Sequence, residues 1–436
     1  MQAGTTHRIL RERMAYSGIL MLVYLLGRSI PIPWVEYQRA EPAGEGIQAV
    51  AMSFLGSSTG KTSLFSLGLM PWVTAMVMVT VFQKTAADKT EKKSPGRANR
   101  ITLSLALLFA VGQSLVQAAG MTYRPWGNLR VTDLWLLTSA VLIGGSCLIR
   151  WLVGRNQTYG VGGQTLIILV NILGNLKTTA SEVLQSLFEV AGAGSGPQGA
   201  QADRHDFWGI TVSAGQAGQM AGIVLAAAGA FLAVCAVMVF LEGAEFRNTV
   251  RRVGINNLYA QDDYIAIRLF PAGTMPVMYV MSLFTIPYYV LRILQLFWPD
   301  RAWMEQGIAV LNLNNTAGVL IFGGFLLALT AVLSMIFVSP GEIARNLEQQ
   351  GDYIDYLEPG RETAWRLRGE TLTAAFIGGM SSCLLMIPPL LVRAWTGSRS
   401  GIYMAPMTVM VAAGMALELL EEAKVYRTME NYRPFL

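Results

Sequence analysis

The segment from Gly56 to Thr62 combines glycines with a lysine and a hydroxyl residue, the residue types that bind phosphate in P-loop proteins. A P-loop needs the spacing GxxxxGK[ST], which lets backbone amides wrap the phosphates and brings the lysine to them. Here the spacing is one residue too short, so that Leu55 stands where the first glycine is required, and no strand precedes the segment. We therefore interpret it as a mobile segment of small residues and predict no nucleotide site.

Residues that ligate metals or act as nucleophiles are few and scattered. The two histidines lie in polar segments, and the three cysteines lie far apart inside apolar runs. No CxxC pair, HExxH motif or pair of carboxylates occurs within an apolar run, so the sequence predicts no metal, no cofactor and no enzymatic activity. Glu418 stands near the end of the last apolar run, and we interpret it as a carboxylate that reaches water.

The composition is that of a membrane protein. Only 14% of the residues are charged and 53% are hydrophobic, with a mean hydropathy of +0.42, whereas about 25% of an average soluble domain is charged. Apolar runs of about 20 residues, the length that crosses a bilayer core, recur along the chain. The sequence predicts an all-α polytopic membrane protein with ten transmembrane helices. The predicted spans are 15–33, 64–83, 101–121, 133–153, 164–185, 217–242, 272–297, 314–338, 371–396 and 403–420.

The distribution of Lys and Arg predicts the orientation. With ten spans both termini lie on one side, and most basic residues fall into segments on that side. The positive-inside rule then places both termini in the cytoplasm of a multi-pass plasma-membrane protein. Segments 243–270 and 339–370 on that side are long and charged, and they are either solvated connectors or a docking surface for a soluble partner. The net charge of +5 arises from such loops, so we predict no nucleic-acid partner.

Two apolar runs begin with similar breaks, Gly68–Pro71 in the first part of the chain and Gly273–Pro276 in the second. Corresponding broken spans are typical of inverted repeats around a central site. We expect halves at 1–190 and 217–436, joined by a small-residue outer loop at 191–216. A secondary transporter of a small solute is the alternative function, but an ion-driven transporter would be expected to place ionisable residues in mid-span.

Several blocks resemble, in order, motifs of the SecY/Sec61α family of protein-conducting channels, and they cover nearly the whole chain. Phe65–Ala75 is similar to the second-span motif FALGIMPYISA of that family, and Pro271–Pro276 is similar to the opening of its seventh span. Phe337–Leu347 and Leu357–Thr363 resemble FNPEETADNL and IRPGEQT. The resemblance implies two inverted five-helix halves around an hourglass pore, closed by a plug and opening sideways between the second and seventh spans.

The resemblance also implies roles for particular residues. The plug corresponds to about 51–61, a half-apolar outer segment that could re-enter the membrane. It contains Met52, Phe54, Leu55 and Gly56. The apolar pore ring corresponds to Val73, Val77, Leu169, Leu173, Thr274, Met278 and Val411, and such a constriction limits ion leakage by dewetting. The candidate contacts of the lateral gate are Thr80 and Gln113. The candidate residues for partner docking are Arg251, Arg252, Glu358, Arg361 and Arg366.

The family's arginine before Pro-Gly in the last large cytoplasmic loop is replaced here by Glu358, and Arg361 is displaced by three residues. This departure makes the chain resemble a divergent accessory paralogue of the channel. The resemblance implies a channel subunit that moves unfolded secretory polypeptides across and into the bilayer. The implied partners are a SecA-like ATPase and SecE-like and SecG-like small membrane subunits.

Overall fold

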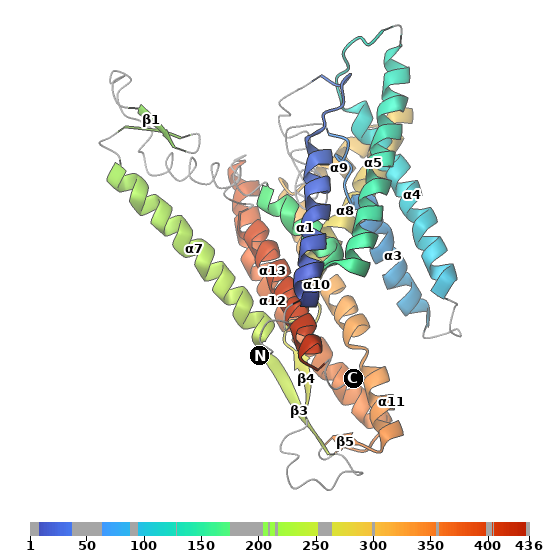
Figure 1. Cartoon of the computed structure of the whole chain (residues 1–436), viewed down its shortest axis with the longest axis vertical. Helices are drawn as coiled ribbons and strands as arrows, with labels where there is room; N and C mark the ends of the chain where they lie inside the picture. Colours follow the sequence, from blue (N-terminus) through green and yellow to red (C-terminus); the bar gives the residue numbers. More distant parts are fainter. Residues whose placement is uncertain are drawn as a thin grey trace.

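The structure is a computed structural model. It describes residues 8–36, 63–87, 95–127, 129–174, 204–207, 210–213, 217–251, 264–298, 301–354, 357–397, 403 and 405–432. Within these residues the chain is predominantly helical, which confirms the predicted class (Figure 1).

Each predicted span overlaps one helix. In the first half the helices are α1 (Arg8–Ser29), α3 (Met70–Ala87), α4 (Pro95–Ala119), α5 (Val131–Tyr159) and the unlabelled helix Gly163–Gly174. In the second half they are α7 (Ala217–Gly243), α8 (Met275–Phe297), α10 (Thr316–Val338), α12 (Arg361–Thr396) and α13 (Ala405–Tyr432). The described parts of five helices are long and apolar enough to cross a membrane, so the number of ten spans stays a prediction.

The boundary between α10 and α11 (Pro340–Gln350) follows from local chemistry. The side chain of Asn315 caps the start of α10 by accepting a hydrogen bond from the amide of Ala317. Ser339 ends α10 in the left-handed region, with φ of 46°, and Pro340 then starts α11, where its missing N–H costs no hydrogen bond. Ser339 and Pro340 thus separate the two helices.

The two long charged segments are more regular than the predicted loops. Segment 243–270 contains the antiparallel strands β3 (Glu245–Arg251) and β4 (Tyr264–Arg268). Segment 339–370 contains α11, the short strand β5 (Tyr353–Ile354) and the first ten residues of α12. Strand β5 pairs with β3 to give the order β4-β3-β5. We call β3, β4, β5, α11 and the start of α12 the platform, and it projects from one end of the helices (Figure 1).

The outer connection also holds a small hairpin. Strands β1 (Arg204–Phe207) and β2 (Ile210–Ser213) pair antiparallel, where the sequence indicated only a small-residue loop. Another short helix, α9 (Ala302–Val310), follows α8.

The main apolar core joins the two halves. It is built from α1, α3, α5 and the helix Gly163–Gly174 on one side, and from α7, α8, α10, α12 and α13 on the other. Large apolar side chains also remain exposed along the outer faces of the helices, for example Leu26, Leu320 and Leu384. Such exposure on many helices is expected of a protein whose outer surface faces lipid.

Candidate functional site

The structure brings most of the predicted pore ring together. Val73 and Val77 of α3, Met278 of α8 and Val411 of α13 are at most 2% exposed and belong to the main core. Leu169, in the helix Gly163–Gly174, is partly buried and packs against that core. These five residues come from four helices of both halves, and their arrangement as a ring around a pore stays a prediction.

The other two predicted ring residues lie differently. Thr274 immediately precedes α8 and is buried, and it packs so closely on Gly414 of α13 that a Cβ there would overlap its methyl group. Leu173 is 51% exposed and is not part of the core. Their membership of a ring stays a prediction.

Sequence reasoning did not single out the methionines that line the same core. Met281 of α8 and Met410 and Met415 of α13 are fully buried among the ring candidates. The sequence does contain a pattern that predicts their burial, because Met407, Met410 and Val411 fall on one face of a helix. Methionine is unbranched and adapts its shape, so this core can yield to different side chains more easily than a core of branched residues.

The seam between α3 and α8, where the resemblance places the lateral gate, contains a polar contact that the sequence did not reveal. The hydroxyl groups of Thr74 and Ser282 are hydrogen-bonded across the seam, and both side chains are fully buried. Thr80 instead donates to the carbonyl of Met76 in its own helix, at 2.8 Å. Gln113 of α4 is 2% exposed, and its side-chain oxygen has no hydrogen-bond partner among the described residues. The gate roles of Thr80 and Gln113 stay predictions.

The predicted plug residues Met52, Phe54, Leu55 and Gly56 lie outside the described residues. The chain is described again from Ser63, which forms a β-bridge with Pro31 after the first span. The amide of Leu64 donates to the carbonyl of Ile30 at 3.2 Å. Ser63 and Leu64 therefore lie beside the residues that follow α1.

A glycine-rich turn, Gly160–Gly163, connects α5 to the next helix and is held by buried side chains. The Asn156 amide donates to the carbonyls of Val161 and Gly163, both at 3.0 Å. Its oxygen accepts a hydrogen bond from Ser17 of α1 at 2.7 Å. Side chains of α5 and α1 therefore stabilise the turn.

The same turn also reaches the second half. The amide of Gly162 donates to the Glu422 carboxylate of α13 at 2.9 Å. Arg13 of α1 donates to the carbonyl of Gly160 and to the Tyr426 hydroxyl, at 3.2 and 3.1 Å. We call this meeting of α1, α5 and α13 the junction. It places the start of α1 beside the end of α13, as an even number of spans requires.

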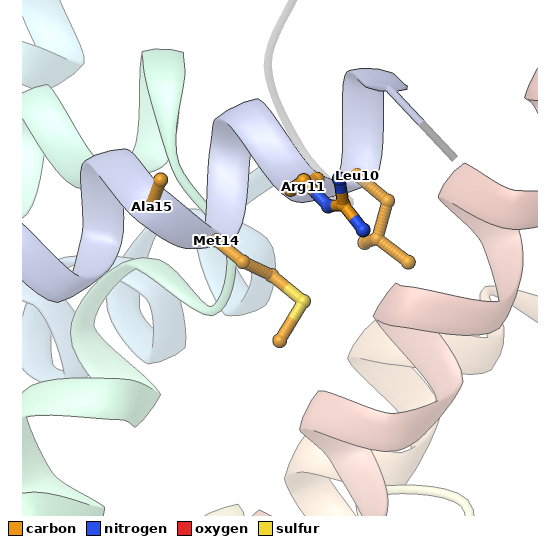
Figure 2. A pocket seen from close by; sticks show the side chains of 4 residues that line it. All are labelled: Leu10, Arg11, Met14 and Ala15. Atoms are coloured by element: carbon orange, nitrogen blue, oxygen red, sulfur yellow. The ribbon is translucent and has the colours of Figure 1, made fainter. Parts of the chain in front are cut away.

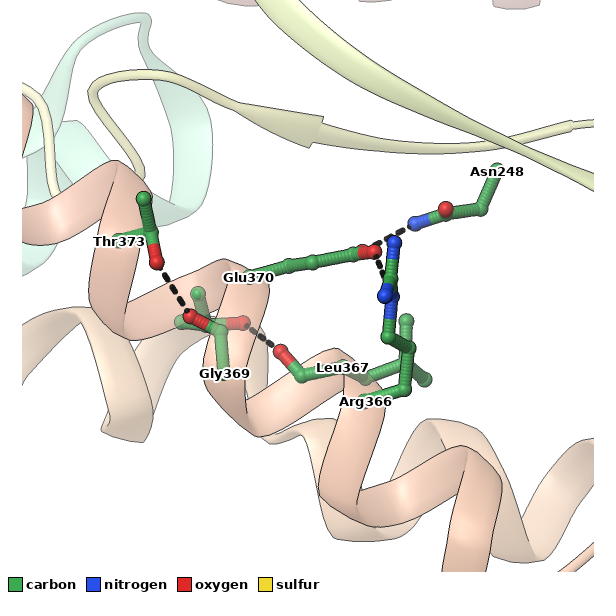
Figure 3. A network of polar contacts seen from close by, with 7 residues as sticks. Asn248, Arg366, Leu367, Gly369, Glu370 and Thr373 are labelled. Carbon is green, nitrogen blue, oxygen red and sulfur yellow. Dashed lines mark hydrogen bonds and ion pairs between the residues drawn. The ribbon is translucent and has the colours of Figure 1, made fainter.

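The platform has its own core and polar network. Ile267 of β4, Leu347 of α11, Ile354 of β5 and Leu367 of α12 are buried together. Figure 3 shows how Glu370 connects the elements, because its carboxylate accepts hydrogen bonds from Asn248 of β3 and from Arg366 of α12. Charged segments about a hundred residues apart in the chain therefore form one unit.

The platform is also tied to the last helix. Arg268 of β4 forms an ion pair with Glu421 of α13 at 2.8 Å, and this hydrogen bond raises the pKa of the Arg268 guanidinium. The platform therefore contacts the C-terminal part of α13.

Three of the predicted docking residues are exposed on the platform. Glu358 and Arg361 lie at the start of α12, and Arg366 follows one turn later, paired with Glu370 at 2.7 Å. Arg251 ends β3, where its backbone pairs with Tyr353, and Arg252 lies outside the described residues. The docking role stays a prediction for all five.

Away from the core and the platform, the described residues form few arrangements that could catalyse a reaction or bind a metal. Figure 2 shows an open hollow beside α1 that is lined by Leu10, Arg11, Met14 and Ala15, a set without a catalytic pair. Within the described part of the chain, no three His, Cys, Asp or Glu side chains are placed to hold a metal ion.

Comparison with known proteins decides the family. A family model described as SecY matches residues 63–420, well over half of the chain. This chain belongs to the SecY family. The predicted resemblance is confirmed, and with it the interpretation of the chain as a channel subunit of a protein translocase.

Curated SecY relatives of two kinds align with nearly the full chain. The accessory Sec system protein translocase subunit SecY2 of Streptococcus sanguinis (strain SK36) is 24% identical over 431 residues, which are 98% of each protein. The protein translocase subunit SecY of Staphylococcus carnosus (strain TM300) is 24% identical over 437 residues, 98% of this chain and 96% of the relative.

The fold is that of solved SecY channels. A structure titled "The structure of a protein conducting channel" matches with a TM-score of 0.65 and 15% identity, over 97% of this chain and 93% of the other. A second, which concerns the plug domain of SecY, matches with a TM-score of 0.61 and 16% identity over the same shares.

Proposed function

We propose that this SecY-family chain conducts unfolded polypeptides outward across the plasma membrane and releases apolar segments sideways into lipid. The path passes through the ring formed by Val73, Val77, Met278 and Val411 with Leu169. A plug at about 51–61 closes it from outside, and the seam between α3 and α8 opens it to lipid. Both termini lie in the cytoplasm, and the chain itself performs no covalent chemistry.

The buried apolar core between the halves carries this proposal. An aqueous path for small ions would need polar groups at its narrowest point, whereas an apolar constriction excludes water and ions until a polypeptide displaces it. The ring candidates come from four helices of both halves, and Met278 and Met410 can repack around a passing chain. The contact between Thr74 and Ser282 closes the seam with a single hydroxyl pair, which separates at modest cost.

The platform and the exposed apolar faces of the helices are the surfaces on which we propose that partner proteins bind. A SecA-like ATPase docks on the platform and supplies the energy, and SecE-like and SecG-like small subunits cover apolar helix faces. Relatives of the accessory and the general kind match equally well, at 24% identity. The assignment to an accessory export system therefore rests on Glu358, an acidic residue at the position where the family usually has an arginine.

A stalled substrate should crosslink to the ring. Single cysteines at Val77 and Met278, in a chain whose native cysteines are replaced, are expected to form disulfides with a cysteine in a trapped secretory polypeptide. Leu320 of α10, which is 58% exposed, is the control position and should give no product. Crosslinking is read on gels after translocation is arrested. Absence of product at both ring positions with every substrate would contradict the proposed path.

Charge reversal at Glu358 should change the affinity of the motor. Glu358→Arg alters the local charge by two units on an exposed part of the platform, and we expect about a threefold or larger change in the Kd of a SecA-like ATPase at low salt. The matched control is Glu305→Arg on α9, at the far end of α8 from the platform, which should have no effect. Binding is measured with the chain in lipid nanodiscs. An unchanged Kd for Glu358→Arg would remove this residue from the docking surface.

A further inference from the structure

The two helices that form the lateral seam are entered through the same short sequence. Residues 64–71 and 269–276 share Leu, Phe, Gly, Met and Pro at the same five of eight positions. The first segment leads into α3 and the second into α8, which are the second helices of their respective halves. The shared sequence therefore marks corresponding places in the two halves.

The two segments also share a backbone conformation. Gly68 and Gly273 have φ of 60° and 56°, a region that disfavours residues with a side chain. The amide of each glycine donates to the carbonyl of the preceding phenylalanine, Phe65 or Phe270, at 3.0 Å in both cases. Each helix is thus entered through a left-handed glycine that reverses the chain.

Each segment rests on a glycine of the helix that corresponds to the fourth predicted span of its half, α5 or α12. A Cβ on Gly145 of α5 would overlap the carbonyl oxygen of Leu64 and lie 3.4 Å from the Phe65 ring. A Cβ on Gly378 of α12 would lie 3.0 Å from the carbonyl oxygen of Leu269 and 2.5 Å from the ring of Phe270. The same two groups, a leucine carbonyl and a phenylalanine ring, therefore occupy the space of the missing side chain in both halves.

We propose that Gly145 and Gly378 are positioning residues. Each is a fixed contact point, which we call a seat, about which α3 or α8 rotates when the seam between these two helices opens. This inference rests on the proposed function, because it assigns the fixed points of the lateral gate. Since the halves are inverted, the two seats lie at opposite ends of the seam. Each helix is held at its own start, so its far end is displaced most when the helix rotates.

The two seats differ in one respect. Beside Gly145, the hydroxyl of Ser146 donates to the carbonyl of Gly68 at 3.0 Å, and the indole N–H of Trp72 donates to Ser146 at 2.9 Å. The residue after Gly378 is Gly379, which has no side chain to form such bonds. Ser146 therefore adds hydrogen bonds to the seat of α3 that Gly379 cannot add to the seat of α8, and α8 is the more mobile wall of the gate.

A pivot predicts a displacement that grows with distance from the seat. With a rise of about 1.5 Å per residue, Ser282 lies about 10 Å and Ile293 about 27 Å from the start of α8. Ser282 meets Thr74 of α3, and the Ile293 side chain lies 3.2 Å from the Cβ position of Gly112 in α4. These two contacts give a near and a far distance probe on the same helix.

The test combines Gly378→Ala with cysteine pairs in the resting channel, in a chain whose native cysteines are replaced. The near pair is Thr74→Cys with Ser282→Cys, and the far pair is Gly112→Cys with Ile293→Cys. We expect Gly378→Ala to lower crosslinking of the far pair by about threefold, and that of the near pair by less than half as much, because the displacement scales with distance along the helix. Adding Phe270→Leu makes room for the new methyl group and should restore the far pair.

Two matched controls use glycines of the same helices that have free space around the Cβ position. Gly369→Ala on α12 and Gly144→Ala on α5 should leave both pairs unchanged, since nothing lies within 4 Å of either Cβ position. Unchanged crosslinking of both pairs in Gly378→Ala would overturn the proposal, as would an equal loss at both pairs that Phe270→Leu does not restore. The readout needs no substrate, so failure of the translocation proposal would be seen separately, in the substrate crosslinks.

Discussion

Asn156→Leu is expected to destabilise the protein by about 3 kcal/mol or more, because each buried carbonyl left without a donor costs about 1–3 kcal/mol. The Asn156 side chain is fully buried, and its amide donates hydrogen bonds to the carbonyls of Val161 and Gly163. Leucine has the same number of heavy atoms with the same branching, but its methyl groups are bulkier and it offers no hydrogen bond. The turn Gly160–Gly163 should then loosen and release both α1 and α13 from the junction.

The measurement is the fraction of chain that remains monodisperse after heating in detergent, compared over a range of temperatures. Thr158→Ala is the matched control on the same helix, since Thr158 is exposed and donates only to the carbonyl of Gly154. We expect a clear downward shift of the midpoint for Asn156→Leu and almost none for Thr158→Ala. Equal midpoints for the two variants would show that the junction is not held by Asn156.

Polar substitution of the ring should make the resting channel leak. We expect Met278→Asn combined with Val411→Asn to raise the ion conductance of the closed channel about tenfold, because amide groups allow water to fill a constriction that is otherwise dry. Both side chains are at most 2% exposed, so the change acts inside the core. Single-channel recording of the assembled translocase in a planar bilayer measures the effect without a substrate.

The control for the leak is Val332→Asn on α10, a residue that is 39% exposed on the outer face of the helices. It introduces the same group without touching the core and should leave the conductance at its original level. A double variant as tight as the unsubstituted channel would show that Met278 and Val411 do not line the narrowest part of the path.

The helices could be predicted from the sequence because a bilayer demands long apolar runs, and such runs are a local property. The predicted 314–338 and the observed Thr316–Val338 agree closely for this reason. The ninth span was predicted at 371–396, and the helix that contains it, α12, begins ten residues earlier, at Arg361. Residues 361–370 are polar, and they are helical because Leu367 packs against α11 and the sheet, which no local pattern in the sequence reveals.

The platform and the seam could not be predicted because they depend on contacts between distant residues. The pairing of Val250 with Ile354 joins strands about a hundred residues apart, and neither short strand has a distinctive pattern. Thr74 and Ser282 are ordinary hydroxyl residues inside apolar helices, where most such groups bond to their own backbone. The repeated Leu-Phe and Gly-x-Met-Pro are visible in the sequence, but the seats on which they rest, Gly145 and Gly378, could not be identified from it.

The construction of the platform sets an order of events during synthesis. Strand β3 emerges from the ribosome early, yet its partners β5 and Glu370 follow about a hundred residues later. Until then β3 lacks the partners that complete the platform. The docking role proposed for the platform therefore implies that a newly made channel binds its motor only after α12 has begun to form.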